Sequence, residues 1–258
     1  MAADKDHQEH PLANVLVNVL IPVLALSYLS KDPEFQRAIG KTVQPWHIGP
    51  VKALMVALAF PIAYGIRHFI KTRKANFFSA LGLVSVLLTG GLTIFLWNED
   101  GTIKPNADVL FGLKEASIPL ILGIAVIGSH FTSTPLLRTF LYSDTMFDIA
   151  RIEKEVDAKN ARAGYEKIIF QATLLFAASF FISTLLNFGL ALYFLGSLDH
   201  TAANARELYN EQVAKLTGWG FAVIGLPILV FLFITLRRMI TQLSKLTGLK
   251  EEEIMLPR

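Results

Sequence analysis

Long apolar runs separated by shorter polar segments dominate the hydrophobic pattern of this chain. Six runs reach about 18 residues or more, roughly the length an α-helix needs to cross a hydrocarbon core of about 30 Å. They occupy residues 12–29, 49–66, 77–97, 109–131, 168–198 and 213–236. The pattern therefore predicts an all-α membrane protein in which residues 1–258 form one polytopic domain with six transmembrane helices.

The longest polar interruption, residues 135–167, lies between the fourth and fifth predicted spans. It contains aliphatic residues at three- and four-residue spacing, namely Ile149, Ile152 and Val156, which predict a short amphipathic helix. Along that helix Arg151 is spaced to pair with Asp148 and Glu155. We expect the helix to dock under the bundle or lie on the membrane surface, and the alternative is a site for a partner.

Basic residues are spread unevenly over the segments between spans. If the N-terminus is cytoplasmic, 16 of the 24 Lys and Arg residues fall on the cytoplasmic side. The excess of positive charge on inner segments predicts that both termini and the 135–167 loop are cytoplasmic. Trp46, Trp97 and Trp219 would then lie near the outer headgroup layer, which indole rings favour.

Composition supports a bilayer location, because 53% of the residues are hydrophobic, only 17% are charged and the mean hydropathy is +0.47. Such a chain has too little polar surface for a soluble domain. A net charge of +3 carried in the loops indicates orientation in a membrane, with no nucleic acid as partner. The absence of cysteine excludes disulfides and thiolate metal sites.

The fourth predicted span carries Lys114 and Glu115 within its apolar sequence. A charged side chain deep in such a helix costs about 2.5–3.5 kcal/mol on insertion scales, which makes it a functional candidate. Pro119 leaves the carbonyl of Glu115 without its helical donor. Two interpretations stay open: Lys114 snorkels to the nearer interface while Glu115 pairs with a neighbour, or the two residues form a substrate or proton site.

Amide side chains add to this candidate polar site. Asn14 and Asn18 share one face of the first span, and Asn187 lies in the fifth. Buried amides usually join membrane helices, although they also contact ligands. Asn18 precedes an Ile-Pro element by the same spacing as Glu115, a pattern that would fit two inverted halves.

Small residues at helical spacing predict tight helix packing in two spans. They are Gly82, Ser85, Thr89, Gly90, Gly91 and Thr93 in the third, and Ser179 and Ser183 in the fifth. Prolines predict kinks at Pro22, Pro61, Pro119 and Pro227.

The six histidines lack metal-binding spacing, and no nucleophile elbow or nucleotide-binding glycine motif is present. We therefore expect no metal, no cofactor and no enzymatic activity.

Several short motifs resemble the intracellular septation protein A (YciB-like) family of bacterial inner-membrane proteins. Leu88–Phe95 reads Leu-Thr-Gly-Gly-Leu-Thr-Ile-Phe, and Trp97–Asp100 reads Trp-Asn-Glu-Asp. Lys114 fits the lysine that enters the family's next helix, and Pro135–Arg138 fits its Pro-Leu-aliphatic element. The resemblance covers about residues 77–141. The Lys-Glu-Ala-x-Ile-Pro sequence also resembles a broader group of longer bacterial proteins related to that family.

The resemblance implies a multi-pass protein of the bacterial inner (cytoplasmic) membrane that acts in cell-envelope maintenance or division. It implies membrane lipid and membrane-protein partners, with a second copy of the chain as an alternative, and no assigned catalysis. The charged loop at residues 144–167 and the long final helices depart from the family pattern. The alternative function is a small secondary transporter or ion-coupled permease using Lys114, Glu115, Asn18 and Asn187.

Overall fold

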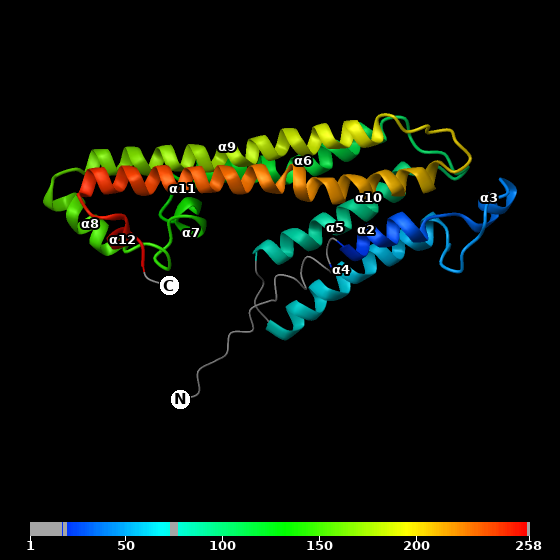
Figure 1. Cartoon of the computed structure of the whole chain (residues 1–258), viewed down its shortest axis with the longest axis horizontal. Coiled ribbons are helices and arrows are strands. Elements are labelled where there is room, and N and C mark those ends of the chain that lie inside the picture. Colours follow the sequence, from blue (N-terminus) through cyan, green and yellow to red (C-terminus); the bar gives the residue numbers. More distant parts are fainter. Residues whose placement is uncertain (1–16, 18–19, 73–76, 257–258) are drawn as a thin grey trace. The chain divides into compact units, whose positions relative to one another are not determined.

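The computed structural model describes residues 17, 20–72 and 77–256 (Figure 1). Its elements are α2 (Ile21–Leu24), the π-helix η2 (Ala25–Leu29), α3 (Pro33–Ala38), α4 (Pro50–Thr72), α5 (Phe77–Leu96), α6 (Ala107–Ser129), α7 (Leu136–Phe140), α8 (Ile149–Ala158), α9 (Arg162–Leu195), α10 (Ala205–Val223), α11 (Gly225–Thr247) and α12 (Glu251–Ile254). These residues form helices and no β-strand, with isolated bridges pairing Trp97 with Ile103 and Phe147 with Met255.

Within the described residues, four helical segments are long and apolar enough to cross a membrane. They are Pro50–Arg67, Ala107–Ser129, Arg162–Leu195 and Ala205–Thr247. In α5, the described apolar stretch is the shorter Leu87–Leu96. The predicted class, an all-helical protein with membrane-length helices, is confirmed, whereas the number of spans and their orientation stay predictions.

The last long helices extend past their predicted apolar limits. α9 begins at Arg162, six residues before the apolar run, and its 34 residues give a length of roughly 50 Å. α10 likewise begins at Ala205, and α11 ends only at Thr247. Hydropathy marks where a helix is apolar, and polar turns with good helix formers continue it beyond that limit.

Proline has different consequences in different helices. Pro61 and Pro119 lie inside the continuous helices α4 and α6, and Pro22 lies in the first turn of α2. The helical segment that begins at Ala205 is interrupted between α10 and α11, at Ile224, three residues before Pro227. Because Pro227 has no N–H, it cannot bond the carbonyl of Val223.

The chain divides into two compact units. Unit 1 contains residues 1–114 and 188–222, and unit 2 contains residues 115–187 and 223–258. The described core of unit 1 gathers around buried aromatic and aliphatic side chains that include Leu96, Ile103, Phe111, Leu195 and Tyr209. The rings of Phe111 and Tyr209 meet edge to face, with centroids 6.3 Å apart.

In unit 1, buried polar side chains of α10 also form hydrogen bonds with the segment that leads into α4. Asn210 donates from Nδ2 to Ser30 Oγ at 3.0 Å and to the Pro50 carbonyl at 2.9 Å. The carboxylate of Glu207 accepts from the Asp32 backbone N–H at 3.2 Å and from Gln36 Nε2 at 3.3 Å. These bonds satisfy groups whose burial would otherwise be costly.

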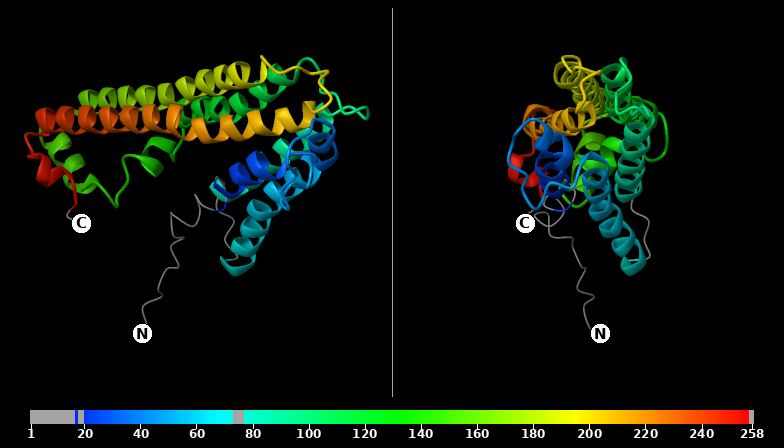
Figure 2. Two further views of the ribbon diagram at one scale, coloured as in Figure 1. Left: turned by 45° about the vertical axis from the view of Figure 1, so that its right-hand side comes forward. Right: turned by 90° about the vertical axis from the view of Figure 1, so that its right-hand side faces the viewer.

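In unit 2, α9 and α11 run side by side, as the left view of Figure 2 shows. Gly164 permits a close approach, because a Cβ there would lie 2.9 Å from Leu246 Cδ1. Further along, Gln242 Nε2 donates to Gln171 Oε1 at 3.4 Å. A small residue and an amide pair therefore hold these helices together, two devices common in membrane bundles.

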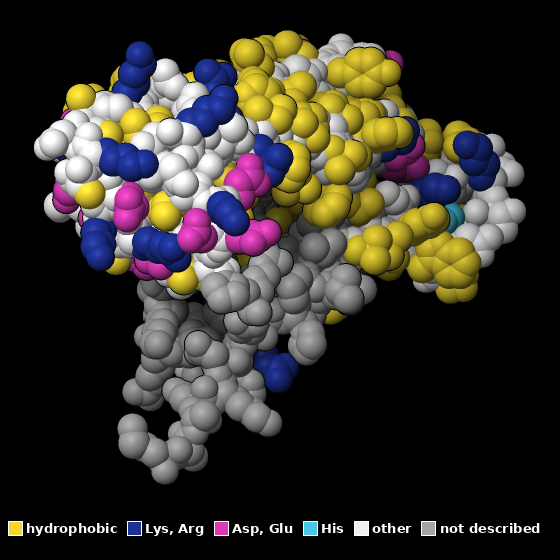
Figure 3. All heavy atoms as spheres, turned by 60° about the vertical axis from the view of Figure 1, so that its left-hand side comes forward, with side chains coloured by type: hydrophobic (Ala, Val, Ile, Leu, Met, Phe, Trp, Pro, Cys, Tyr) yellow, Lys and Arg dark blue, Asp and Glu magenta, His cyan; other side chains and the backbone are white. Residues whose placement is uncertain are grey.

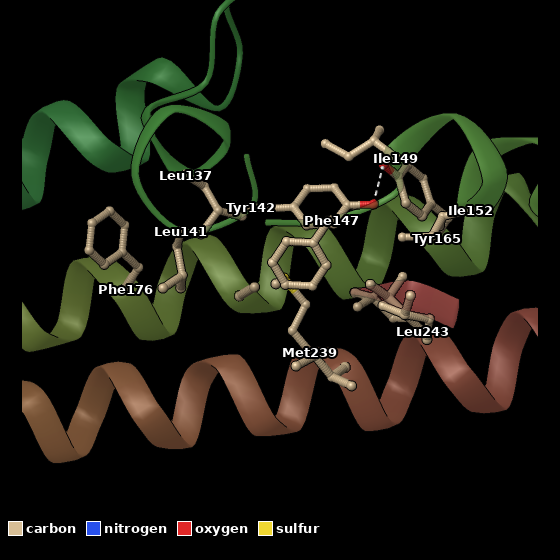
Figure 4. Close-up of a cluster of buried hydrophobic side chains, with 14 of the residues drawn as sticks. Leu137, Leu141, Tyr142, Phe147, Ile149, Ile152, Tyr165, Phe176, Met239 and Leu243 are labelled. Atoms are coloured by element: carbon tan, nitrogen blue, oxygen red, sulfur yellow. Dashed lines mark hydrogen bonds between the residues drawn. The ribbon is translucent and has the colours of Figure 1, made fainter. Parts of the chain in front are cut away.

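The end of unit 2 carries a folded cap, which we define as α7, α8 and α12 with the adjoining ends of α9 and α11. Its core contains Tyr142, Phe147, Ile152, Met239 and Leu243, all with at most 1% exposure (Figure 4). The apolar face of α8 thus packs against the rest of the cap. The predicted pairing of Arg151 within α8 is wrong: its guanidinium bonds Glu253 Oε1 at 2.6 Å, while Asp148 caps α8 through the Arg151 backbone N–H.

The C-terminal residues complete this cap. Ile254 is fully buried, and its carbonyl accepts the Asp148 N–H at 3.0 Å. The Leu256 N–H then donates to the Met146 carbonyl at 3.0 Å. These backbone bonds fix α12 beside the residues that precede α8.

Candidate functional site

Lys114 lies in the second turn of α6 and is half-buried. Its ammonium donates to Thr89 Oγ1 of α5 at 2.5 Å, and the Thr89 hydroxyl donates to the Ser85 carbonyl at 2.8 Å. The ammonium also lies 5.4 Å from the centroid of the Phe111 ring, within reach of a cation–π contact. A charged group in an apolar helix is thereby compensated by a neighbouring helix.

The other members of the predicted polar site are placed differently. Glu115 is half-buried on the same turn, ahead of the buried Pro119. Asn187 donates from Nδ2 to the Ser183 carbonyl at 2.8 Å and lies 3.1 Å from Ser183 Oγ, so these amide bonds stay within α9. Asn14 and Asn18 lie outside the described residues.

The predicted packing residues fall into two groups. Gly90 faces α4, where a Cβ would lie 2.5 Å from Leu58 Cδ1, and the buried Thr93 hydroxyl lies 3.5 Å from Tyr209 Oη. By contrast, a Cβ on Gly91 would meet no atom within 4 Å. The buried Ser179 donates to the Phe176 carbonyl of its own helix at 2.7 Å. The side-chain surroundings of Gly82 are outside the described part.

Two glycines that were not predicted as packing residues, Gly112 and Gly123, set the contact between α6 and α9. A Cβ on Gly112 would lie 2.8 Å from Phe188 Cδ2, and one on Gly123 would lie 3.0 Å from Phe181 Cε1. Phenylalanine rings therefore pack directly on the α6 backbone. The available signal was a glycine within a run of bulky residues, which is weak because many such glycines have open space.

A polar pocket of about 440 Å³ lies where α6 ends and α9 begins, within unit 2. Its lining consists of His130, Thr132, Ser133, Pro135, Arg138, Glu153, Arg162, Tyr165, Glu166 and Ile169. This volume is typical of small-ligand sites, which span about 300–1,000 Å³. The sequence signal for it was the polar run Ser-His-Phe-Thr-Ser-Thr directly after the apolar α6.

One wall of this pocket is a hydrogen-bonded chain that leads into the cap core. Arg138 Nη2 donates to Glu153 Oε1 at 2.5 Å and to Tyr165 Oη at 3.4 Å, and Tyr165 Oη donates to Tyr142 Oη at 3.4 Å. Burial acts to lower the pKa of Arg138, but Tyr165 and Glu153 outweigh it and raise the pKa above its ordinary value. Burial raises the pKa of Tyr142, and Tyr165 raises it further.

The wall at Arg162 is looser, although its guanidinium also lies 5.4 Å from the centroid of the Tyr165 ring. The guanidinium of Arg162 lies 3.8 Å from Glu166 Oε1 and 3.9 Å from Asp157 Oδ1, with all three side chains more than half exposed. These separations exceed hydrogen-bond distance. The pocket therefore presents charged groups of both signs, one pair fixed and one pair loosely placed.

The described residues contain no group of three His, Asp or Glu side chains able to hold a metal ion. The chemistry that the pocket offers is recognition of charged and hydroxyl-bearing groups by hydrogen bonds and ion pairs.

The described structure defines a class: an all-helical protein with membrane-length helices and a folded, charged cap on unit 2. No family model, no curated protein and no solved structure matches the chain. The resemblance to septation protein A therefore stays a prediction.

Proposed function

We propose that this chain is a six-span protein of the bacterial inner membrane, with both termini in the cytoplasm, that serves cell-envelope maintenance or division through contacts with other membrane proteins. The proposed orientation is supported by the uneven distribution of basic residues. It places the cap of unit 2 in the cytoplasm, continuous with helices whose exposed side chains are apolar.

The observation that carries this proposal is the charged exterior of the cap. Its ion pairs join different elements: Arg138 with Glu153, Arg151 with Glu253, and Arg237 with Glu251 at 2.9 Å. In Figure 3, blue and magenta side chains gather on this end, beside a yellow surface. Charges fixed on a packed core favour protein recognition, because little ordering entropy is lost on binding and charge pattern selects partners.

The orientation can be tested by thiol labelling, since the chain contains no cysteine of its own. Single variants Thr102→Cys and Ala203→Cys should react with a membrane-impermeant maleimide in intact cells. Lys154→Cys and Glu252→Cys should react only after the membrane is permeabilised. The reverse pattern would overturn the proposed orientation.

The function can be tested by complementation of a strain that lacks the protein. Cell length and sensitivity to envelope stress should be restored by the native chain and by Leu229→Ala, a change on the exposed apolar exterior. Lys154→Glu, at an exposed position of α8, should restore neither, while protein abundance stays constant. Full rescue by Lys154→Glu, or an unaffected deletion strain, would contradict a role based on cap contacts.

A second candidate, an ion-coupled permease, is favoured by one observation: the Lys114 ammonium is held between two apolar helices by Thr89. Intramembrane ionisable groups frequently mark ion pathways. In vesicles, Glu115→Gln should abolish ion-coupled flux if this candidate is correct. Unchanged flux removes Glu115 from the mechanism, and the absence of flux with the native protein removes the candidate.

A further inference from the structure

The polar pocket lies at a sharp change of surface character along α9. Arg162 and Glu166 are charged and exposed, whereas Phe170 and Leu174, one and two turns later than Glu166, are apolar and exposed. The ring of His130, which lines the pocket, lies 5.0 Å from the Phe170 ring and 5.3 Å from that of Phe131. Phe131 is itself 79% exposed. The pocket thus adjoins an exposed apolar surface, the arrangement expected at the depth of lipid headgroups.

The charges that line the pocket balance. Two guanidinium groups, of Arg138 and Arg162, accompany two carboxylates, of Glu153 and Glu166. The formal charges of these four groups sum to zero. A purely anionic ligand would meet two carboxylates of its own sign, whereas a zwitterionic ligand can pair both of its charges.

The loose wall has the donors and acceptors that a zwitterion requires. Because Arg162 lies beyond hydrogen-bond distance of Glu166 and Asp157, those contacts do not engage its N–H groups in hydrogen bonds. A guanidinium binds phosphate well, through paired N–H donors. Glu166 offers carboxylate oxygens to an ammonium, and the hydroxyls of Thr132 and Ser133 line the same pocket.

We infer that this pocket binds the headgroup of an amine-bearing zwitterionic phospholipid, phosphatidylethanolamine. Arg162 binds the phosphate, with Arg138 as the fixed second positive charge, and Glu166 binds the ammonium. The acyl chains lie along the exposed surface at Phe131, Phe170 and Leu174. The inference requires a bilayer around the chain but none of the protein contacts of the proposed function.

Native mass spectrometry of the full-length protein in detergent micelles tests this assignment. Delipidated protein receives phosphatidylethanolamine and phosphatidylglycerol at equal concentration, with identical acyl chains. The native chain should retain one phosphatidylethanolamine with about tenfold preference, as expected for one additional charge-assisted hydrogen bond. Arg162→Ala should lower retention of that lipid about tenfold, whereas Arg238→Ala, at an exposed position of α11 outside the pocket, should not change it.

Glu166→Gln gives the decisive comparison, because it removes the acceptor for the ammonium and leaves the pocket positively charged. Retention should shift toward phosphatidylglycerol, a result that general loss of structure would not produce. Equal retention of both lipids by the native chain, or an unchanged preference in Glu166→Gln, would overturn the assignment. Displacement of the lipid by an equal concentration of free phosphoethanolamine would show instead that the ligand is soluble.

Discussion

The ammonium of Lys114 and the hydroxyl oxygen of Thr89 lie 2.5 Å apart and connect α6 to α5. The two residues are 25 positions apart in the sequence, on helices that are otherwise largely apolar. The sequence predicts a free-energy cost for placing the charge of Lys114 in an apolar helix, and it predicts Thr89 as a helix-packing residue. The structure pairs the two. The contact makes both residues testable together.

Thr89→Val should destabilise the protein by about 1–2 kcal/mol, because it leaves the Lys114 ammonium without this acceptor. Adding Lys114→Met should recover part of the loss, since no charge is then left without its partner. The free energies of unfolding of the single and double variants in micelles measure this coupling. Thr184→Val is the matched control, because its hydroxyl bonds the Phe180 carbonyl of its own helix. Additive effects of Thr89→Val and Lys114→Met would show that the contact has no energetic importance.

Gly112→Ala should destabilise the protein by about 1–3 kcal/mol, because the new methyl group would overlap Phe188 and also lie 3.3 Å from Ala191 Cβ. Gly128→Ala, in the same helix, has open space at its Cβ and should be neutral or stabilising. Thermal unfolding of both variants, followed by circular dichroism, gives the comparison. Equal melting temperatures would mean that the contact between α6 and α9 can accommodate the added methyl group with little loss of stability.

Tyr142→Phe should move alkaline unfolding of the cap to higher pH. The folded-state pKa of Tyr142 is raised, first by burial, while in the unfolded chain it is ordinary, near 10. The neutral phenol therefore supports folding fully below about pH 10, and that support is lost as pH rises toward the folded-state pKa. Near-UV circular dichroism across pH 8–12 measures the midpoint. Tyr193→Phe, at a 75% exposed position, should leave it unchanged, and the same midpoint in all three proteins would refute the linkage.

Ile254→Ala should cost about 2–5 kcal/mol, as expected for truncation of a fully buried aliphatic side chain. Leu256→Ala, only two residues later, removes a 38% exposed side chain and should cost less than about 1 kcal/mol. Limited proteolysis within residues 135–160 reports on cap opening, and cleavage should accelerate only in Ile254→Ala. Identical cleavage rates would show that the C-terminal residues do not support the cap.

The helical class and most long helices follow from the sequence, because continuous apolar runs have few alternatives to a helix. The ends of α9 and α11 do not, since the charged turns at Arg162 and Lys245 are helical without being apolar. The amphipathic α8 was predicted from its spacing alone. The ion partner of Arg151 in α8 is Glu253, which lies 102 residues later in the sequence, and local spacing cannot reveal such a contact.

The site residues also differ in whether they can be predicted from their own segment or depend on contacts with distant segments. Lys114 could be predicted as a candidate site residue, because the free-energy cost of a charge in an apolar helix depends only on the residues of that helix. Its partner Thr89 could be selected only as a small polar residue. The pocket at Arg162 and Glu166 was not predicted, because its lining combines residues of several elements, each of which looks like an ordinary charged surface in sequence.

The cap also constrains the order of events during biosynthesis. The apolar face of α8 is synthesised about 100 residues before Ile254, which completes the covering of that region. At a translation rate of about 5–20 residues per second, the gap lasts roughly 5–20 s. During that interval the apolar face of α8 lacks its contacts with α12, the last element of the cap to be synthesised.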